Sequence, residues 1–175
     1  MANLKNNSNY IHSKYLDLAF EQAKINLGST KKNPSVGCVI VKDGAVISSG
    51  HTALNGRPHA EFNALNKRKK FKNANLYVTL EPCSHYGFTP PCTNMIIKKK
   101  IKKVFYCISD YDSRSKEKSR KILSKKKILV FSSLLKKKAS NFYKSYYLQH
   151  SSNLPLVDAK IAISKDYFTK NIKKK

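Results

Sequence analysis

The chain has 175 residues, of which 35 are Lys or Arg and 10 are Asp or Glu, and its formal net charge is +25. This length fits one domain of ordinary size. No window approaches the roughly 20 consecutive apolar residues that a membrane-spanning helix needs, and the polar N-terminus lacks the apolar stretch of a secretory signal. We therefore expect a cytoplasmic protein without a membrane partner.

The positive charge comes almost entirely from lysine, with 31 Lys against four Arg. Arginine is the residue that binds phosphates and base edges through two parallel hydrogen bonds, and it is scarce here. The lysine runs therefore favour a solvated basic surface over a groove built for nucleic acid.

Hydrophobic periodicity predicts helices that alternate with strands. In chain order, the expected elements are a helix over Ser13–Leu27, strands Val36–Val41 and Ala45–Ile47 joined by an Asp43-Gly44 turn, a helix over His59–Lys69, strand Leu76–Leu80, helix Cys92–Ile97, strand Val104–Ile108, helix Ser115–Ser124, strand Ile128–Phe131, helix Ala139–Gln149 and strand Leu156–Ile163. This alternation is typical of a layered α/β domain around a mostly buried sheet.

The four cysteines fall into two pairs with different surroundings. Cys38 and Cys107 lie inside apolar strands, where cysteine usually packs as a small hydrophobic residue. Cys83 and Cys92 each follow a proline at an edge of the loop between them. A thiol near the start of a helix has a lowered pKa, and this favours the thiolate form that binds metals.

His59 and Glu61 complete a set of side chains that suits a catalytic zinc ion. Two thiolates and one neutral imidazole leave a fourth position for water, as in catalytic rather than structural zinc sites. Residues two apart do not share a helical face, so both reach one site only if that site lies beyond the helix start. Glu61 would then move protons beside the metal, which lowers the pKa of its bound water toward about 7.

Each of these features is weak alone. A His-x-Glu tripeptide is common, and Glu61 would equally suit the first turn of a helix, where the macrodipole favours a carboxylate. The joint pattern is more specific. A His-Ala-Glu at a helix start, a strand that ends in Glu81-Pro82-Cys83 and a second Pro-Cys form the zinc deaminase signature.

Longer motifs extend this signature. Over roughly residues 10–131 the sequence resembles the cytidine/deoxycytidylate deaminase superfamily, through Asn33-Pro34-Ser35-Val36-Gly37, His59-Ala60-Glu61 and Thr79-Leu80-Glu81-Pro82-Cys83. The segment Ser84-His85-Tyr86-Gly87-Phe88-Thr89-Pro90-Pro91-Cys92 is similar to a loop of the riboflavin-biosynthesis deaminases that act on diaminohydroxyphosphoribosylaminopyrimidine. Nucleic-acid deaminases of the superfamily instead have a short Cys-x-x-Cys.

The resemblance implies a three-layer α/β/α fold with a mixed central sheet, one zinc ion per chain and association into homo-oligomers. It implies hydrolytic removal of the 2-amino group of a phosphorylated pyrimidine, with release of ammonia. By the same resemblance, the zinc ligands are His59, Cys83 and Cys92, the proton shuttle is Glu61, and the substrate-binding positions are Asn33, Ala60, His85 and Asp110.

Three departures from the family pattern concern the substrate. Many relatives have Lys or Arg, suited to the substrate phosphate, where Phe88 stands. Their later loop is rich in Pro and Gly, whereas here it reads Asp110-Tyr111-Asp112-Ser113-Arg114-Ser115. Relatives have a histidine just before the Gly-x-Pro-His segment. In this chain it is displaced by one position, with His51 followed by Thr52. We expect Arg114, or a nearby lysine, to supply the charge for the phosphate.

We expect a deaminase domain over residues 9–133, a connecting helix and linker over 134–153, and the start of a further domain over 154–175. Residues 154–166 resemble the opening strand of the NADPH-dependent reductase domain that follows in the family. The 21 residues from Pro155 onward are far fewer than a nucleotide-binding domain needs, so we expect no NADPH site in this chain.

Two other interpretations stay open. A tRNA adenosine deaminase or another nucleic-acid deaminase would account for the charge of +25 and predicts binding that weakens steeply with salt. The long loop between the cysteines and the scarcity of arginine argue against it. A metal-binding protein without activity is the second interpretation, and the presence of all four residues of the metal chemistry argues against that.

Overall fold

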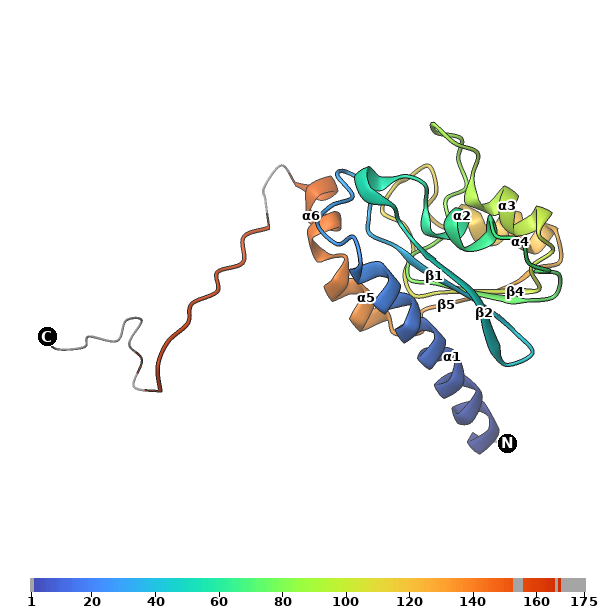
Figure 1. Ribbon diagram of the computed structural model, residues 1–175, viewed down its shortest axis with the longest axis horizontal. Coiled ribbons are helices and arrows are strands. Elements are labelled where there is room, and N and C mark those ends of the chain that lie inside the picture. Colours follow the sequence, from blue (N-terminus) through green and yellow to red (C-terminus); the bar gives the residue numbers. More distant parts are fainter. Residues whose placement is uncertain (1, 153–155, 166, 168–175) are drawn as a thin grey trace, which may run out of the picture.

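The computed structural model describes residues 2–152, 156–165 and 167 (Figure 1). The helices are α1 (Ala2–Lys24), the short 3-10 helix η1 (Leu54–Gly56), α2 (Ala60–Leu65), α3 (Cys92–Lys98), α4 (Lys118–Lys125), α5 (Lys136–Phe142) and α6 (Lys144–Ser151), and the strands are β1 (Gly37–Lys42), β2 (Ala45–His51), β3 (Asn75–Val78), β4 (Lys103–Tyr106) and β5 (Leu129–Ser132). Within these ranges, no helix has the length and apolar character to cross a membrane.

The five strands form one mixed sheet in the order β2-β1-β3-β4-β5. β1 pairs antiparallel with both β2 and β3, whereas β3, β4 and β5 are parallel. The predicted hairpin turn is confirmed, because Asp43 and Gly44 adopt φ of 50° and 79°, and two positive values in succession are typical of a tight hairpin. The parallel strands end at one edge of the sheet, and the loops that follow them meet there.

Helices cover both faces of this sheet, so the predicted three-layer α/β/α fold is confirmed (Figure 1). α1 packs on one face, where α5 joins it through the edge-to-face contact of Phe20 with Phe142. α2, α3 and α4 cover the other face. α2 lies unusually close to β2, because a Cβ added to Gly50 would stand 2.5 Å from the carbonyl oxygen of Ala60. A glycine at this position therefore sets how near the start of α2 approaches the sheet.

The predicted core is confirmed in its main parts. Leu16, Ala19, Phe20 and Ala23 of the predicted stripe on α1 are fully buried. Leu27 is an exception, being 54% exposed, because α1 ends at Lys24 and the chain turns away before Gly28. Cys38 and Cys107 are buried in the sheet region, as expected for structural cysteines.

Three other expectations differ from the structure. The helix expected over His59–Lys69 stops at Leu65, since Lys67–Lys70 offers only cations and no apolar residue to extend the buried stripe. The helix expected over Ala139–Gln149 is two helices, and the chain bends between them at Tyr143, whose buried hydroxyl bonds to Thr79 (2.5 Å).

The strand expected over Leu156–Ile163 is wrong for its described residues. They form no strand, and Val157 and Ile161 are 79% and 71% exposed. Within the described residues, no strand of the sheet pairs with this segment to supply the backbone hydrogen bonds that a strand requires. Residues 154, 155, 166 and 168–175 of the predicted reductase start lie outside the described residues.

Candidate metal centre and active site

Three side chains of metal-ligand type meet where α2 and α3 begin. His59 is the residue that immediately precedes α2, Cys92 is the first residue of α3, and Cys83 follows β3 in the loop between them. The Nδ1 atom of His59 lies 3.6 Å from Sγ of Cys83 and 3.5 Å from Sγ of Cys92. All three ligand atoms lie within 4.8 Å of one another, and they form the one such cluster in the described part of the chain.

These spacings fit a tetrahedral zinc ion. With Zn–N near 2.0–2.1 Å and Zn–S near 2.3 Å, neighbouring ligand atoms of a tetrahedron stand about 3.6 Å apart. Hydrogen bonds from Cys92 and His59 lower the pKa of the Cys83 thiol, and the backbone N–H of Cys92 donates to the same sulfur across 3.2 Å. The donor set and its spacing therefore match what the sequence pattern predicts. The lowered pKa expected of both thiols is found at Cys83 alone, because the hydrogen bond with Cys83 and burial raise the pKa of the Cys92 thiol.

Glu61 lies in the first turn of α2, and its side chain is buried beside this cluster. Burial and the negative charge of Cys83 raise the pKa of its carboxyl to about 7. A carboxyl with a pKa near neutrality can accept a proton and release it again. Its neighbour Ala60, also fully buried, packs its backbone against Gly50 and does not line the cavity described next.

A small cavity of about 70 Å³ opens beside the cluster, and most of the predicted substrate-binding side chains line it. His59, Glu61 and Cys83 form its metal side. The predicted residues Asn33, His85 and Asp110 are also among its lining residues. Arg114 is absent from the lining, because its exposed guanidinium forms a two-pronged ion pair with Asp112 (2.6 Å for the shorter contact).

Asn33 is held at the cavity wall by its backbone and side chain. Its carbonyl oxygen accepts a hydrogen bond from Thr30 (2.7 Å), and its Nδ2 donates to the carbonyl oxygen of Gly56 (3.3 Å). Gly56 has a φ of 91°, and a Cβ at this residue would lie 2.3 Å from Nδ2 of Asn33. Only a glycine allows this contact.

Thr52 follows the displaced histidine, His51, and these two residues differ in their position relative to the cavity. Thr52 is 1% exposed and lines the cavity, whereas His51 does not. The hydroxyl of Thr52 accepts from the backbone N–H of Val36 (2.9 Å) and lies near the carbonyl oxygen of Pro34. The threonine therefore ties the Asn33 segment to the end of β2.

Glu81, which the sequence analysis treated only as part of a motif, organises the loop that follows β4. Its buried carboxylate accepts hydrogen bonds from the backbone N–H groups of Asp110 (3.2 Å), Glu117 (2.9 Å) and Ser119 (3.2 Å) and from the Ser119 hydroxyl (2.6 Å). One residue of the cysteine segment thus fixes the loop that carries Asp110. Nothing in the sequence around Glu81, a glutamate next to a proline, indicates that its side chain holds this loop.

Ser115 connects the same loop to the segment after Cys83. Its fully buried hydroxyl lies 2.8 Å from Nδ1 of His85 and accepts from the backbone N–H of Ser84 (3.1 Å). His85 is thereby oriented at the cavity. Ser115 was expected only as the start of a helix, and α4 instead begins at Lys118.

Tyr146 of α6 is a further cavity residue that the sequence analysis missed. Its hydroxyl donates to Oδ1 of Asp110 (3.0 Å), and its ring lines the cavity. The neighbouring Tyr147 donates to the carbonyl oxygen of Ser109 (2.7 Å). A pair separated by 36 residues leaves no mark in local periodicity, so sequence alone offered no signal for the contact.

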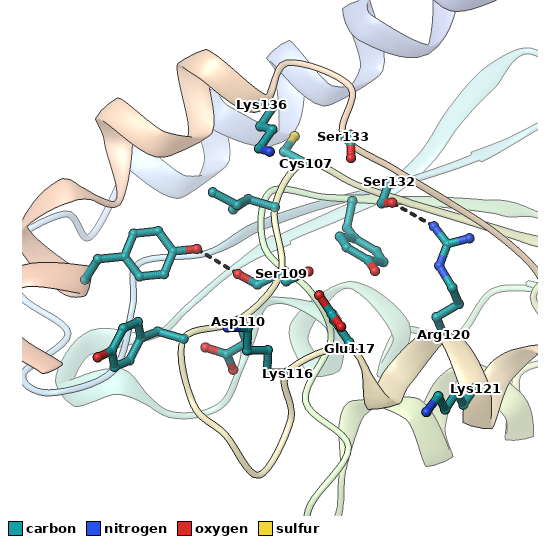
Figure 2. Close-up of a pocket in the computed structure, with 14 residues that line it drawn as sticks. Cys107, Ser109, Asp110, Lys116, Glu117, Arg120, Lys121, Ser132, Ser133 and Lys136 are labelled. Carbon is teal, nitrogen blue, oxygen red and sulfur yellow. Dashed lines mark hydrogen bonds between the residues drawn. The ribbon is translucent and has the colours of Figure 1, made fainter. Parts of the chain in front are cut away.

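A second cavity, of about 620 Å³, lies at the carboxyl ends of β4 and β5 (Figure 2). Arg120 stands at its edge and donates to the hydroxyl of Ser132 (2.7 Å). Asp110 is the one residue that lines both cavities, and none of the three metal-type side chains reaches this one. A further cavity, of about 300 Å³, is lined by His59 and Cys92 but not by Glu61. The small cavity is the candidate active site, because Glu61 lines it together with His59 and Cys83.

Comparison with known proteins agrees with this geometry. The family described as "Cytidine and deoxycytidylate deaminase zinc-binding region" matches residues 9–108. The chain is 37% identical over 142 residues to the diaminohydroxyphosphoribosylamino-pyrimidine deaminase of Buchnera aphidicola subsp. Schizaphis graminum, and the match covers 81% of this chain and 97% of that protein.

Longer proteins share the same region. Riboflavin biosynthesis protein RibD of Bacillus amyloliquefaciens is 39% identical over 153 residues, which are 87% of this chain but 41% of that protein. The solved structure of RibD from Acinetobacter baumannii superposes with a TM-score of 0.81 at 38% identity, over 90% of this chain and 45% of that one. The chain thus spans less than half the length of these two proteins. Fold, motif and relatives agree that it belongs to the cytidine and deoxycytidylate deaminase family, in the group of the diaminohydroxyphosphoribosylaminopyrimidine deaminases.

Proposed function

We propose that this chain is a zinc-dependent aminohydrolase of riboflavin biosynthesis. Its substrate would be 2,5-diamino-6-(5-phosphoribosylamino)pyrimidin-4-one, and its products 5-amino-6-(5-phosphoribosylamino)uracil and ammonia. The observation that carries the proposal is the cluster of His59, Cys83 and Cys92 with the buried carboxyl of Glu61 beside it. The relative from Buchnera, named for this deamination, supports the choice of substrate.

His59, Cys83 and Cys92 would hold one zinc ion per chain. When bound, such an ion supplies a water of lowered pKa that attacks a ring carbon at neutral pH. The spacing of the three ligand atoms supports this assignment, and so does the chemistry of two thiolates and one imidazole. Three protein ligands leave the open position that a catalytic site requires.

Glu61 would carry the protons of the reaction. Hydrolysis adds the oxygen of one water to the pyrimidine C2 and breaks the bond from C2 to the amino nitrogen. Glu61 would accept a proton from the water and pass it to the ring nitrogen beside C2. It would then take the second proton from the added oxygen, as the C2 carbonyl forms, and deliver it to the departing amine, which leaves as ammonia. The buried position of Glu61 keeps bulk water from competing for this proton transfer.

The other cavity residues would orient the base. Asn33 and Asp110 present an amide and a carboxylate to the cavity, while His85 lines it and is held by Ser115. Polar groups fixed by hydrogen bonds to the protein suit the recognition of a ring that carries several N–H groups. These roles are those of positioning, because Glu61 already accounts for the proton transfers.

The test is ammonia release by zinc-loaded protein on three substrates: the phosphoribosyl diaminopyrimidine, cytidine and a transfer RNA. The proposal expects turnover of the first alone, with the uracil product identified by mass. Turnover of transfer RNA, together with binding that weakens steeply with salt, would instead support the nucleic-acid deaminase. Absence of ammonia from all three would leave a metal-binding protein without activity.

A further inference from the structure

The cavity is too small to enclose the whole substrate of the proposed function, on which this inference rests. Its volume is about 70 Å³, whereas sites that enclose a small molecule usually measure about 300–1,000 Å³. Only the reacting end of the base fits inside. The ribose phosphate must therefore lie over the rim, and a phosphate there requires a positive charge.

The rim segment after Cys83 carries no lysine or arginine of its own. The segment runs from Ser84 to Pro91, and its residue Phe88 is apolar and 95% exposed. The residues that line the cavity include no lysine or arginine either. Arg114, the expected phosphate ligand, instead donates hydrogen bonds from both Nε and Nη2 to the carboxylate of Asp112. The positive charge for the phosphate must therefore come from outside both this segment and the lining of this cavity.

Arg57, two residues before His59, brings a guanidinium to this rim. Its Nη1 donates to the hydroxyl of Thr89 (2.7 Å), and its Cζ lies 5.5 Å from the centroid of the Phe88 ring. A Cβ added to Gly87 would stand 3.5 Å from Nη2 of Arg57 and 3.9 Å from Nε2 of His85. Arg57 and His85 therefore flank the same point of the rim, and His85 lines the cavity.

The guanidinium is also free of any acidic partner. The ion pairs in the described part of the chain join Lys24 to Glu21, Arg114 to Asp112 and Lys138 to Asp17, and none involves Arg57. One nitrogen holds Thr89, and the ring of Phe88 orients the plane of the group. The remaining N–H groups suit the two-pronged binding of a phosphate.

We propose that Arg57 binds the phosphate of the substrate at the cavity rim and thereby gives this chain its preference for a phosphorylated pyrimidine. Phe88 and Thr89 position the guanidinium. Arg57 is a binding residue in this role and takes no part in the proton transfers.

The first test compares Arg57→Gln with the wild type on the phosphorylated substrate and on its dephosphorylated counterpart. For the phosphorylated substrate, KM should rise at least about tenfold, while kcat stays within about threefold. For the dephosphorylated substrate, wild type and variant should have the same KM. The control Arg68→Gln removes the same charge from an exposed arginine, and its KM should equal that of the wild type.

A second variant separates a lost phosphate contact from damage to the loop. Arg57→Gln combined with Phe88→Arg returns a guanidinium to the same rim, at the residue whose ring contacts Arg57. The KM for the phosphorylated substrate should then return to within about threefold of wild type. Three results would overturn the inference: an unchanged KM in Arg57→Gln, an equal loss with both substrates, or a tenfold rise in Arg114→Gln in its place.

A binding measurement keeps this inference separable from the proposed function. Calorimetric titration of the zinc-loaded protein with ribose 5-phosphate should give binding in the wild type that weakens at least about tenfold in Arg57→Gln. A wild type that releases no ammonia yet shows this Arg57-dependent binding would contradict the proposed function and support the rim site. If the wild type deaminates its substrate but binds ribose 5-phosphate no more tightly than Arg57→Gln, the result contradicts the rim site and leaves the proposed function standing.

Discussion

The hydroxyl of Tyr146 donates a hydrogen bond to Oδ1 of Asp110 across 3.0 Å, and both side chains line the cavity beside the metal-type cluster. Tyr146 belongs to α6, beyond residues 9–108 that match the family. The C-terminal helix is thus part of the site wall, although the sequence had placed it in a connecting segment.

Tyr146→Phe removes this hydrogen bond and keeps the ring. The free energy of unfolding should fall by about 1 kcal/mol, and KM should rise several-fold because the Asp110 loop loses a constraint. Urea unfolding and steady-state kinetics measure the two effects. Tyr111→Phe is the matched control, since the hydroxyl of this neighbouring tyrosine has no hydrogen-bond partner in the described chain. Equal effects of the two variants would contradict the assignment.

Asp110 gives a pH prediction whose sign follows from its burial. Burial raises the pKa of this carboxyl, against hydrogen bonds from Asp112 and Tyr146 that lower it. A carboxyl whose pKa is higher in the folded state than in the unfolded state favours folding below its usual value near 3.8. This contribution is lost as pH rises through the folded pKa.

Asp110→Asn should therefore gain stability relative to wild type as the pH rises from about 3.5 to 7, while its KM increases. Urea unfolding of both proteins at several pH values provides the comparison, and the difference between them cancels the other carboxyls. A difference that stays constant across this range would contradict the prediction.

Glu81→Gln should be strongly destabilising. The carboxylate accepts four hydrogen bonds, and an amide in its place turns an NH2 group toward backbone donors. We expect a loss of at least about 2 kcal/mol in unfolding free energy. Glu21→Gln, which breaks an exposed pair with Lys24, should cost less than about 1 kcal/mol under the same conditions. A loss at Glu81 no larger than at Glu21 would refute the role of this carboxylate.

Gly50→Ala tests the close approach of α2 to the sheet. The added Cβ would stand 2.5 Å from backbone atoms of both Ala60 and Ala64, so α2 must move. The cost should be about 1–3 kcal/mol, and zinc content per chain should drop because His59 shifts with the helix. Ser49→Ala, on the opposite side of the same strand, serves as the control in unfolding and in metal analysis. Full zinc content in Gly50→Ala would show that the helix start tolerates the shift.

The sequence alone sufficed for the layered fold and for the meeting of His59, Glu61, Cys83 and Cys92, because motif spacing and helix starts are local signals. It could not supply the contacts between distant segments. Tyr146 with Asp110, and Arg57 with Thr89, join residues more than 30 positions apart. Such pairs depend on where the chain packs in three dimensions.

Two of the differences between expectation and structure have equally physical reasons. Leu156–Ile163 has an apolar, β-branched composition, yet a strand needs a neighbour for its backbone hydrogen bonds and the described chain provides none. Arg114 looked like a phosphate ligand in the sequence. Its neighbour Asp112, two residues away, neutralises it through a turn that composition does not reveal.

Glu61→Gln separates the proton carrier from the metal ligands. Ammonia release from the phosphoribosyl diaminopyrimidine and zinc content should be measured on the same preparations of wild type and variant. We expect the variant to keep one zinc ion per chain and to lose activity by about 10²–10⁴-fold, because the metal ligands remain and the proton carrier does not. A variant that deaminates as fast as the wild type at equal zinc content would contradict this role of Glu61.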